Sequence, residues 1–455
     1  MGSKLRVNIA KSAAFRLVRG TPLLAVLWGL PVAVAQTEHS PVAAIPAGFG
    51  VSNLSAYSSY YSPQPFLSGG SDYDLSWGGT ATLSWNWAHP RSSFLVTYTP
   101  SYTHDATDSA LNALSHRMSL IGRHNFTPAW SFTASLGGEV LNEAEFLFRP
   151  NLFSQVTESV SSPDELATAI LSGVAPDDTH LAALLTGAPI LESPARQVFF
   201  GNRVLNASLE AAVTRRKGRT HVTFSGGGMR IQGLPGSSRA SGTETSLVPS
   251  ITTYRAAVDA SYSLSPRTQV GFTSSTERLV SRFYDAYATS PAVTFGRRMS
   301  ERWFLELHGG AGFFSSQRST SPVPRGAQYV GGGTLGLKTH TQAFLVSSGR
   351  SLSNGYGIGA SSTINTTGSW NWDRPDSGWR LFASGSYQQL RSNGYQPFDA
   401  WVGNVGFSRR LSSKTSMSCT YARLQVNARF TGLPGNGSTN ALRVALFWDP
   451  HFNGN

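Results

Sequence analysis

Glu306 and His308 come nearest to a catalytic pair by residue type and spacing. One residue separates them, so in a strand both side chains lie on one face, where the carboxylate could orient the imidazole as a general base. No serine or second acid is tied to the pair by spacing, although an active site needs such a group. We therefore expect no enzyme activity, and a hydrolase built on this pair stays an alternative.

The other motifs that could bind a ligand are incomplete. Asp72 and Asp74 could offer oxygen ligands to a cation, but two acids in a loop are more often solvated. The glycine runs at 226–228 and 331–333 lack the lysine, the hydroxyl residue and the helix of a phosphate-binding loop. Cys419 is the single cysteine, which excludes a disulfide frame and a paired-cysteine metal site. We expect neither a cofactor nor a metal.

Strands must carry these residues, because apolar and polar side chains alternate along most of the chain. Leu83, Trp85 and Trp87 alternate with small polar residues. The same period of two recurs at 93–99, 130–136, 205–213, 254–262, 303–308, 379–386 and 442–448. This period is typical of strands with one apolar and one polar face.

Two kinds of connection alternate between the predicted strands. Eight are short, at 89–91, 127–129, 216–218, 265–267, 300–302, 339–341, 373–377 and 412–414. Nine are longer, at 62–75, 104–113, 141–200, 232–250, 282–290, 316–326, 351–355, 391–400 and 427–438. Since lipid offers the backbone no hydrogen-bond partner, a sheet within it must close on itself. The pattern predicts an all-β chain, a transmembrane antiparallel up-and-down β-barrel of 16–18 strands with both ends in the periplasm.

Tryptophan positions favour the same fold. All ten tryptophans beyond residue 35 lie near the end of a predicted strand. Eight form a predicted membrane-interface girdle beside short connections or at the end of the last strand: Trp85, Trp87, Trp130, Trp303, Trp370, Trp372, Trp379 and Trp448. Trp77 and Trp401 begin strands after long connections. Indole favours the headgroup level of a bilayer, whereas a soluble sandwich or propeller would bury several in mid-strand.

The first 35 residues are typical of a bacterial secretory signal peptide, with a basic start, an apolar run at 22–32 and small residues before the cleavage site. We expect cleavage after Ala35 and insertion in the cell outer membrane. Without the five basic residues of this segment the formal net charge falls from +12 to +7. Beyond it, no run of 18 apolar residues predicts a helical span, and no basic cluster predicts nucleic-acid binding.

A periplasmic linker is expected at 36–50, the barrel at 51–448 and a tail at 449–455. The connection at 141–200 breaks the strand pattern, because Ser162-Pro163-Asp164-Glu165 is typical of a helix start. We expect a partly helical loop with eight acidic and two basic residues. The loop could form a cap on the outer surface or a constriction inside the lumen, and both alternatives stay open. The constriction candidates are Glu158, Asp164, Glu165, Asp177 and Asp178.

Strand parity selects the charged residues that would face the lumen. They are Arg117, Arg123, Arg255, Arg380, Arg443, Glu210, Asp259, Glu277, Glu306 and His308. As a pore lining they would tune ion selectivity, and as paired charges they would fill a closed barrel. Five arginines against four acids predict little ionic bias.

The signal peptide, the repeated turns (264–268, LSPRT; 411–415, LSSKT) and the final Phe447-Trp448 resemble Gram-negative outer-membrane β-barrel proteins, most closely porin-like barrels. The resemblance covers about 51–448. It implies passive diffusion of small polar solutes, with outer-membrane lipid and the barrel assembly machinery as partners and a homo-oligomer left open. Such proteins commonly end on an aromatic residue, but here seven residues follow Trp448. Extracellular polysaccharide export is an alternative function.

Overall fold

The computed structural model describes eleven stretches of the chain. They are residues 48–62, 74–106, 112–142, 203–234, 250–281, 284–319, 326–354, 360–374, 377–392, 398–428 and 436–448. The chain divides into two units, Met1–Ala33 and Val34–Asn455, and every described residue belongs to the second. The predicted signal peptide and C-terminal tail therefore lie outside the described residues.

The second unit contains one sheet of 18 strands. In chain order they are β1 Gly48–Tyr61, β2 Asp74–His89, β3 Ser92–Asp105, β4 Ala113–Thr127, β5 Trp130–Asn142, β6 Arg203–Lys217, β7 Thr220–Leu234, β8 Ile251–Ser265, β9 Thr268–Ser281, β10 Tyr284–Arg298, β11 Trp303–Ser319, β12 Gln328–Lys338, β13 Gln342–Asn354, β14 Ala360–Arg374, β15 Trp379–Ser392, β16 Phe398–Arg410, β17 Thr415–Ala428 and β18 Asn436–Trp448.

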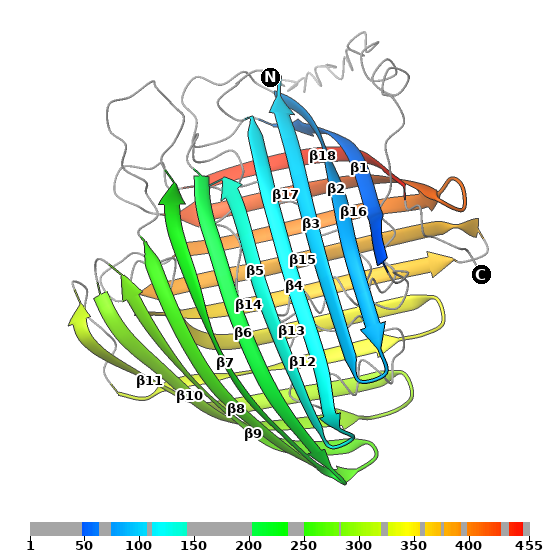
Figure 1. Cartoon of the computed structure of the whole chain (residues 1–455). Coiled ribbons are helices and arrows are strands. Elements are labelled where there is room, and N and C mark those ends of the chain that lie inside the picture. The colour runs from blue at the N-terminus through cyan, green and yellow to red at the C-terminus, as the bar shows by residue number, and fades with distance from the viewer. Residues whose placement is uncertain are drawn as a thin grey trace, which may run out of the picture. The chain divides into compact units, whose positions relative to one another are not determined.

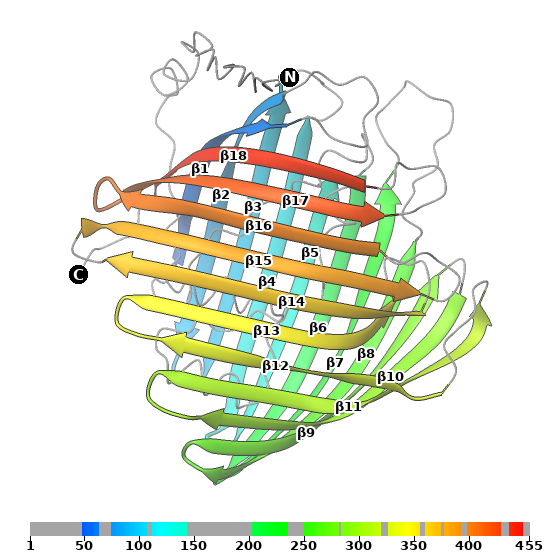
Figure 2. The same cartoon turned by 180° about the vertical axis from the view of Figure 1, so that it is seen from behind.

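The sheet closes into a barrel. Each strand pairs antiparallel with its neighbours in the chain, and β18 pairs with β1. In Figures 1 and 2 the strands of one wall, β2 to β8, cross those of the opposite wall, β12 to β17, at a steep angle. Strands on opposite walls cross in this way because closure tilts every strand against the barrel axis. The predicted barrel of 16–18 strands is confirmed at its upper number.

The β1–β18 seam joins the two ends of the barrel. Leu54 to Tyr61 pair with Ala441 to Trp448. Past the last pair, the Ser62 amide donates to the Asn440 carbonyl, and the Asn440 amide donates to Ser62 Oγ, both at 2.9 Å. β1 begins and β18 ends at the end of the barrel that carries the short connections. This end is called the short-connection end below.

Three of the short connections share a side-chain hydrogen bond that explains their repeated sequence. The hydroxyls of Ser265, Ser300 and Ser412 each accept the backbone N–H two residues further on, at 3.2 Å. A serine in this position mimics a backbone turn and favours a tight reversal. The recurring pattern of Ser, any residue, then Arg or Lys is therefore a turn signal, and it leaves the basic side chain at the surface.

One expectation about the connections is contradicted, and another lies outside the described residues. The long connection predicted at 282–290 is wrong, because only residues 282–283 separate β9 from β10. Pro291 resembles a turn signal in the sequence but lies within β10, opposite Ser274 of β9. Proline has no N–H to donate, and the ladder from β10 to β11 is interrupted at this point. The predicted helices of 141–200 lie outside the described residues, which contain no α-helix.

The barrel also begins earlier than expected, since β1 starts at Gly48 and takes in the end of the predicted linker. No helix in the described part of the chain is long and apolar enough to cross a membrane.

Candidate functional site

The two faces of the sheet differ sharply in chemistry. One face carries small polar side chains with little exposure, such as Ser76 and Ser84 at 2% and 1%. The other carries large exposed apolar side chains, such as Leu209 at 57%, Phe224 at 56% and Val293 at 62%. In a closed barrel the first is the inner face and the second the outer face. The inner wall is therefore the candidate functional site.

The register places all ten predicted pore-lining residues on the inner face. It brings some of them together. Arg255 of β8 pairs directly with Glu277 of β9, and Asp259 lies four residues further along the same face of β8. Glu210 lies in the same cross-strand row as Arg255, with only Gly227 between them. The functional role of these residues stays a prediction.

A charged cluster that the sequence did not predict surrounds Glu139 of β5. Arg117 Nε donates to Glu139 Oε2 at 3.0 Å, and Asn206 Nδ2 donates to Glu139 Oε1 at 3.1 Å. The Glu139 side chain is 10% exposed, whereas that of Arg117 is 47% exposed. A carboxylate held from both sides in this way is fixed to the wall. Arg117 is therefore a half-exposed cation paired with a nearly buried carboxylate.

Glu306 and His308 share the inner face of β11, as their spacing predicts. They pair across the ladder with Thr334 and Gly332 of β12. The Thr334 hydroxyl donates to Ser347 Oγ at 3.1 Å. It is therefore engaged along the wall and is not placed as a nucleophile for Glu306 and His308. The geometry thus adds nothing to the hydrolase alternative.

Sequence reasoning missed a basic rim on the inner face at the short-connection end. Within two residues of a short connection, the described inner face carries five basic residues and one acid: Arg216, Arg298, Lys338, Arg380, Arg410 and Asp373. Arg380 donates to Asp373 Oδ2 at 3.0 Å. Strand parity alone would have found this rim, but residue 216 falls in the predicted short connection 216–218, and Arg298, Lys338 and Arg410 end their strands.

The rest of the described inner face has the opposite balance. Its charged side chains are Arg117, Arg123, Arg255 and Arg443 against Asp105, Glu139, Glu210, Asp259, Glu277 and Glu306. Charge along the inner wall is therefore segregated, with cations gathered at one mouth and an excess of acids further inside. A count over the whole lumen hides this separation.

Three inner aromatic rings lie over glycines of the neighbouring strand. Tyr57 pairs with Gly78, Phe304 with Gly336 and Phe382 with Gly406. The rings are 5%, 5% and 1% exposed. A Cβ built on Gly406 would lie 2.5 Å from Phe382 Cζ, and one on Gly78 would lie 2.6 Å from the Tyr57 hydroxyl. Because the glycines have no side chain, each ring can lie flat on the wall instead of standing into the lumen.

Tyr57 has further contacts on both sides of its strand. Its hydroxyl shares a 2.6 Å hydrogen bond with Thr103 Oγ1 on β3, and the Arg443 guanidinium of β18 lies 3.7 Å from its ring centroid. A cation over an aromatic face is attracted by the ring quadrupole. Tyr57 thus connects four neighbouring strands across the seam and holds Arg443, a predicted pore-lining residue, against the wall.

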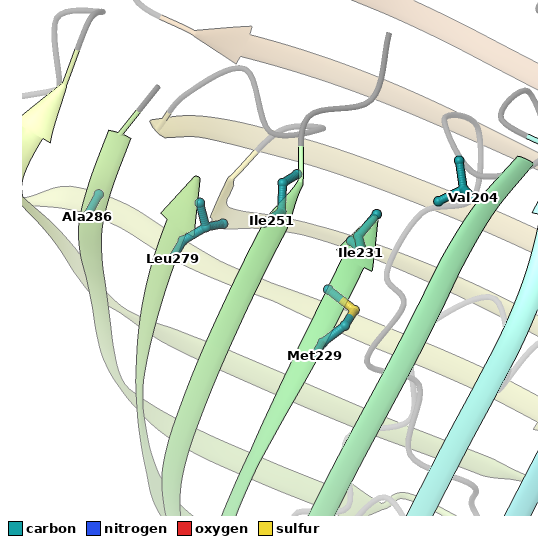
Figure 3. Close-up of a cluster of buried hydrophobic side chains, with 6 residues drawn as sticks. All are labelled: Val204, Met229, Ile231, Ile251, Leu279 and Ala286. Carbon is teal, nitrogen blue, oxygen red and sulfur yellow. The ribbon is translucent and has the colours of Figure 1, made fainter. Parts of the chain in front are cut away.

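The inner face is apolar at the long-connection end of β6 to β10. Val204, Met229, Ile231, Ile251, Leu279 and Ala286 form a buried cluster there (Figure 3). Their exposure is 8% or less. The expectation of a uniformly polar inner face is therefore too simple for this part of the wall.

All eight tryptophans of the predicted girdle lie on the outer face, toward the short-connection end. Trp85, Trp87, Trp130 and Trp303 are exposed at 37% to 48%. The predicted constriction residues of 141–200 lie outside the described residues. Among the described residues, no group of three or more His, Cys, Asp or Glu is placed to hold a metal ion.

No family model matches the chain, and no curated protein matches it in sequence. Solved structures with a similar fold include OccK2 (OpdF) of Pseudomonas aeruginosa, at 9% identity over 87% of this chain and 97% of that chain, with a TM-score of 0.44. A BenF-like porin of Pseudomonas fluorescens Pf-5 matches at 10% identity over 87% and 97%, with a TM-score of 0.41. The FrpB iron transporter of Neisseria meningitidis matches at 8% over 87% and 70%, with a TM-score of 0.42.

These likenesses are remote and say nothing about what crosses this barrel. The porin-like architecture predicted from the strand pattern is confirmed by the closed antiparallel barrel of 18 strands itself.

Proposed function

We propose that the protein is an outer-membrane channel through which small polar solutes diffuse passively along the barrel lumen. The observation that carries the proposal is the closed sheet with an apolar outer face and an inner face of small polar residues. Such a sheet leaves no backbone edge for lipid and offers water a polar surface inside.

The outer face supports a membrane-spanning position. On β16, Trp401, Gly403, Val405 and Phe407 separate Asp399 from Arg409. Ten residues of strand measure roughly 33 Å, which is about 25 Å across the bilayer when the strand is tilted by about 40°. The apolar band between the charged ends therefore matches the height expected for an outer-membrane barrel.

The inner wall supports polar solutes of low specificity. Its hydroxyls and amides pair along the wall, as in Thr97 with Ser119 at 2.6 Å and Asn404 with Ser384 at 2.7 Å. Groups already paired keep their remaining lone pairs for water or a passing solute. Because the basic rim and the acidic interior oppose each other, we expect weak selectivity between anions and cations.

Polysaccharide export and hydrolysis remain alternatives that no described contact favours. Binding to the assembly machinery and homo-oligomer formation also stay proposals.

Conductance across a planar bilayer tests the channel. Refolded protein should give stepwise current, and vesicles containing it should swell in small neutral sugars and amino acids. Heat-denatured protein, identified by its altered electrophoretic mobility, is the matched control and should give neither signal. Folded protein that gives neither current nor swelling would refute the proposal.

A further inference from the structure

The outer surface of the short-connection end is strongly basic. Its outward-facing strand ends and short turns carry ten exposed basic residues: Arg91, Arg215, Lys217, Arg219, Arg267, Arg297, Arg302, Arg374, Arg409 and Lys414. Glu301 is the one acid there among the described residues. These ten residues are called the basic collar. It lies on the same face as the tryptophan girdle, while the basic rim described above faces the lumen.

Two pairs in the collar have the same construction on different walls. Arg215 of β6 is the cross-strand partner of Trp130 of β5, and its Cζ lies 5.4 Å from the indole centroid. Arg409 of β16 is the cross-strand partner of Trp379 of β15, at 5.0 Å. In each pair the indole holds the guanidinium against the outer wall.

The chemistry of such a pair fits a phosphodiester. A guanidinium has five N–H donors in a plane, and stacking on an indole face leaves its edge for hydrogen bonds to phosphate oxygens. An indole at the same level favours the boundary between acyl chains and headgroups. In such a pair the guanidinium is therefore placed to contact the phosphate of a phospholipid, and the indole to contact the boundary with its acyl chains.

The opposite end of the outer face is less suited to anions. Arg423 also stacks on an indole there, with its Cζ 5.8 Å from the Trp401 ring centroid, but two acids share this surface. Arg278 donates two hydrogen bonds to Asp285, at 3.1 and 2.8 Å. Asp399 accepts hydrogen bonds from Tyr387 at 3.2 Å and from Gln389 at 2.8 Å. Acids at this end offset part of the basic charge, whereas the collar has ten basic residues for one acid.

We propose that the basic collar binds anionic glycerophospholipids in the leaflet that surrounds the short-connection end. Arg215 and Arg409, each held by its tryptophan, contact the phosphodiester headgroups. This inference rests on the proposed insertion of the barrel in a membrane, and it adds a preference for lipid charge that a channel does not require.

Quenching of tryptophan fluorescence by brominated lipids tests the preference, since eight of the ten tryptophans beyond residue 35 lie at this end. The protein is reconstituted in vesicles that contain brominated phosphatidylglycerol or brominated phosphatidylcholine at matched mole fractions. Wild type should be quenched more strongly by the anionic lipid, and added salt should weaken the difference.

The double variant Arg215→Gln and Arg409→Gln should lose most of this preference, because each cation near an anionic surface changes binding about fivefold. The matched control, Arg230→Gln with Arg391→Gln at the opposite end, should keep it. Arg215→Lys with Arg409→Lys should keep only part of it, because an ammonium retains the charge but not the planar set of donors. Millimolar inorganic phosphate should not compete with the lipid.

Equal quenching of wild type by both lipids would overturn the proposal. So would an unchanged preference in the Arg215 and Arg409 glutamine variant, or an equal loss in the control. Conductance in the same vesicles separates this failure from that of the channel. Protein that conducts without a lipid preference refutes the collar alone, whereas folded protein that binds the lipid but never conducts refutes the channel alone.

Discussion

Replacing Gly78 by alanine should destabilise the barrel at its seam. The added methyl group would occupy the space of the Tyr57 ring, with the hydroxyl 2.6 Å from the new Cβ, and would also meet the Tyr102 carbonyl oxygen. The ring would have to lift from the wall. It would then lose both its hydrogen bond to Thr103 and its stacking with Arg443.

The magnitude follows from these two contacts. A neutral hydrogen bond contributes about 1 kcal/mol to the free energy of unfolding. A partly desolvated cation–π contact contributes about 1 to 2 kcal/mol. Alanine regains about 0.5 to 1 kcal/mol of backbone entropy relative to glycine. We expect Gly78→Ala to lower the free energy of unfolding by about 2 kcal/mol, and Tyr57→Phe, which removes only the hydroxyl, by about 1 kcal/mol.

Urea unfolding of reconstituted protein, followed by tryptophan fluorescence, measures both losses. A change of about 2 kcal/mol lowers the midpoint by roughly 1 M if m is about 2 kcal/mol per M. Gly349→Ala is the matched control, because a Cβ built there meets its nearest atom, the Gly331 carbonyl oxygen, at 3.7 Å. If Gly78→Ala unfolds at the same urea concentration as Gly349→Ala, the ring does not depend on the glycine and the reasoning fails.

Three further expectations concern the inner wall and the outer face. Arg117→Ala should destabilise the protein by about 2 kcal/mol, and more than Glu139→Gln, because it leaves a nearly buried carboxylate with one donor fewer; the reverse order in urea unfolding would contradict this. The pair Lys338→Glu and Arg410→Glu reverses charge at the inner rim and should shift the reversal potential in a salt gradient toward cation selectivity; an unchanged potential would show that the rim does not face the ion path. Cys419 is half-buried on the outer face, so a charged thiol reagent should label it at least tenfold more slowly in vesicles than in urea, and equal rates would place it in water.

The faces of the strands could be predicted from the sequence. In a strand with a period of two, only one question is open: which of the two alternating sets of side chains faces the lumen. A run such as Leu83, Trp85 and Trp87 beside Ser84 and Asn86 settles that choice for its whole strand. All ten predicted pore-lining residues therefore lie on the inner face. The strand number was predictable to within two, because short and long connections alternate along the chain.

Other features depend on neighbours that are distant in the chain. Tyr57 and Gly78 meet only after β1 and β2 pair, and Arg443 joins them only when the barrel closes. Glu139 gains Asn206 across a connection of 60 residues. The prediction at 282–290 fails because most of this stretch belongs to β10, and β10 also holds Pro291 where its ladder to β11 is interrupted.

The seam also decides how wide the lumen is. A slip of two residues between β1 and β18 would keep every side chain on its own face. The alternation of apolar and polar residues therefore does not disfavour such a slip. Such a slip would change the stagger of the closed sheet, and with it the strand tilt and the barrel diameter. The two reciprocal hydrogen bonds between Ser62 and Asn440 exist in one register only. Two uncharged residues at the long-connection end of the seam thereby help to set the diameter of the lumen.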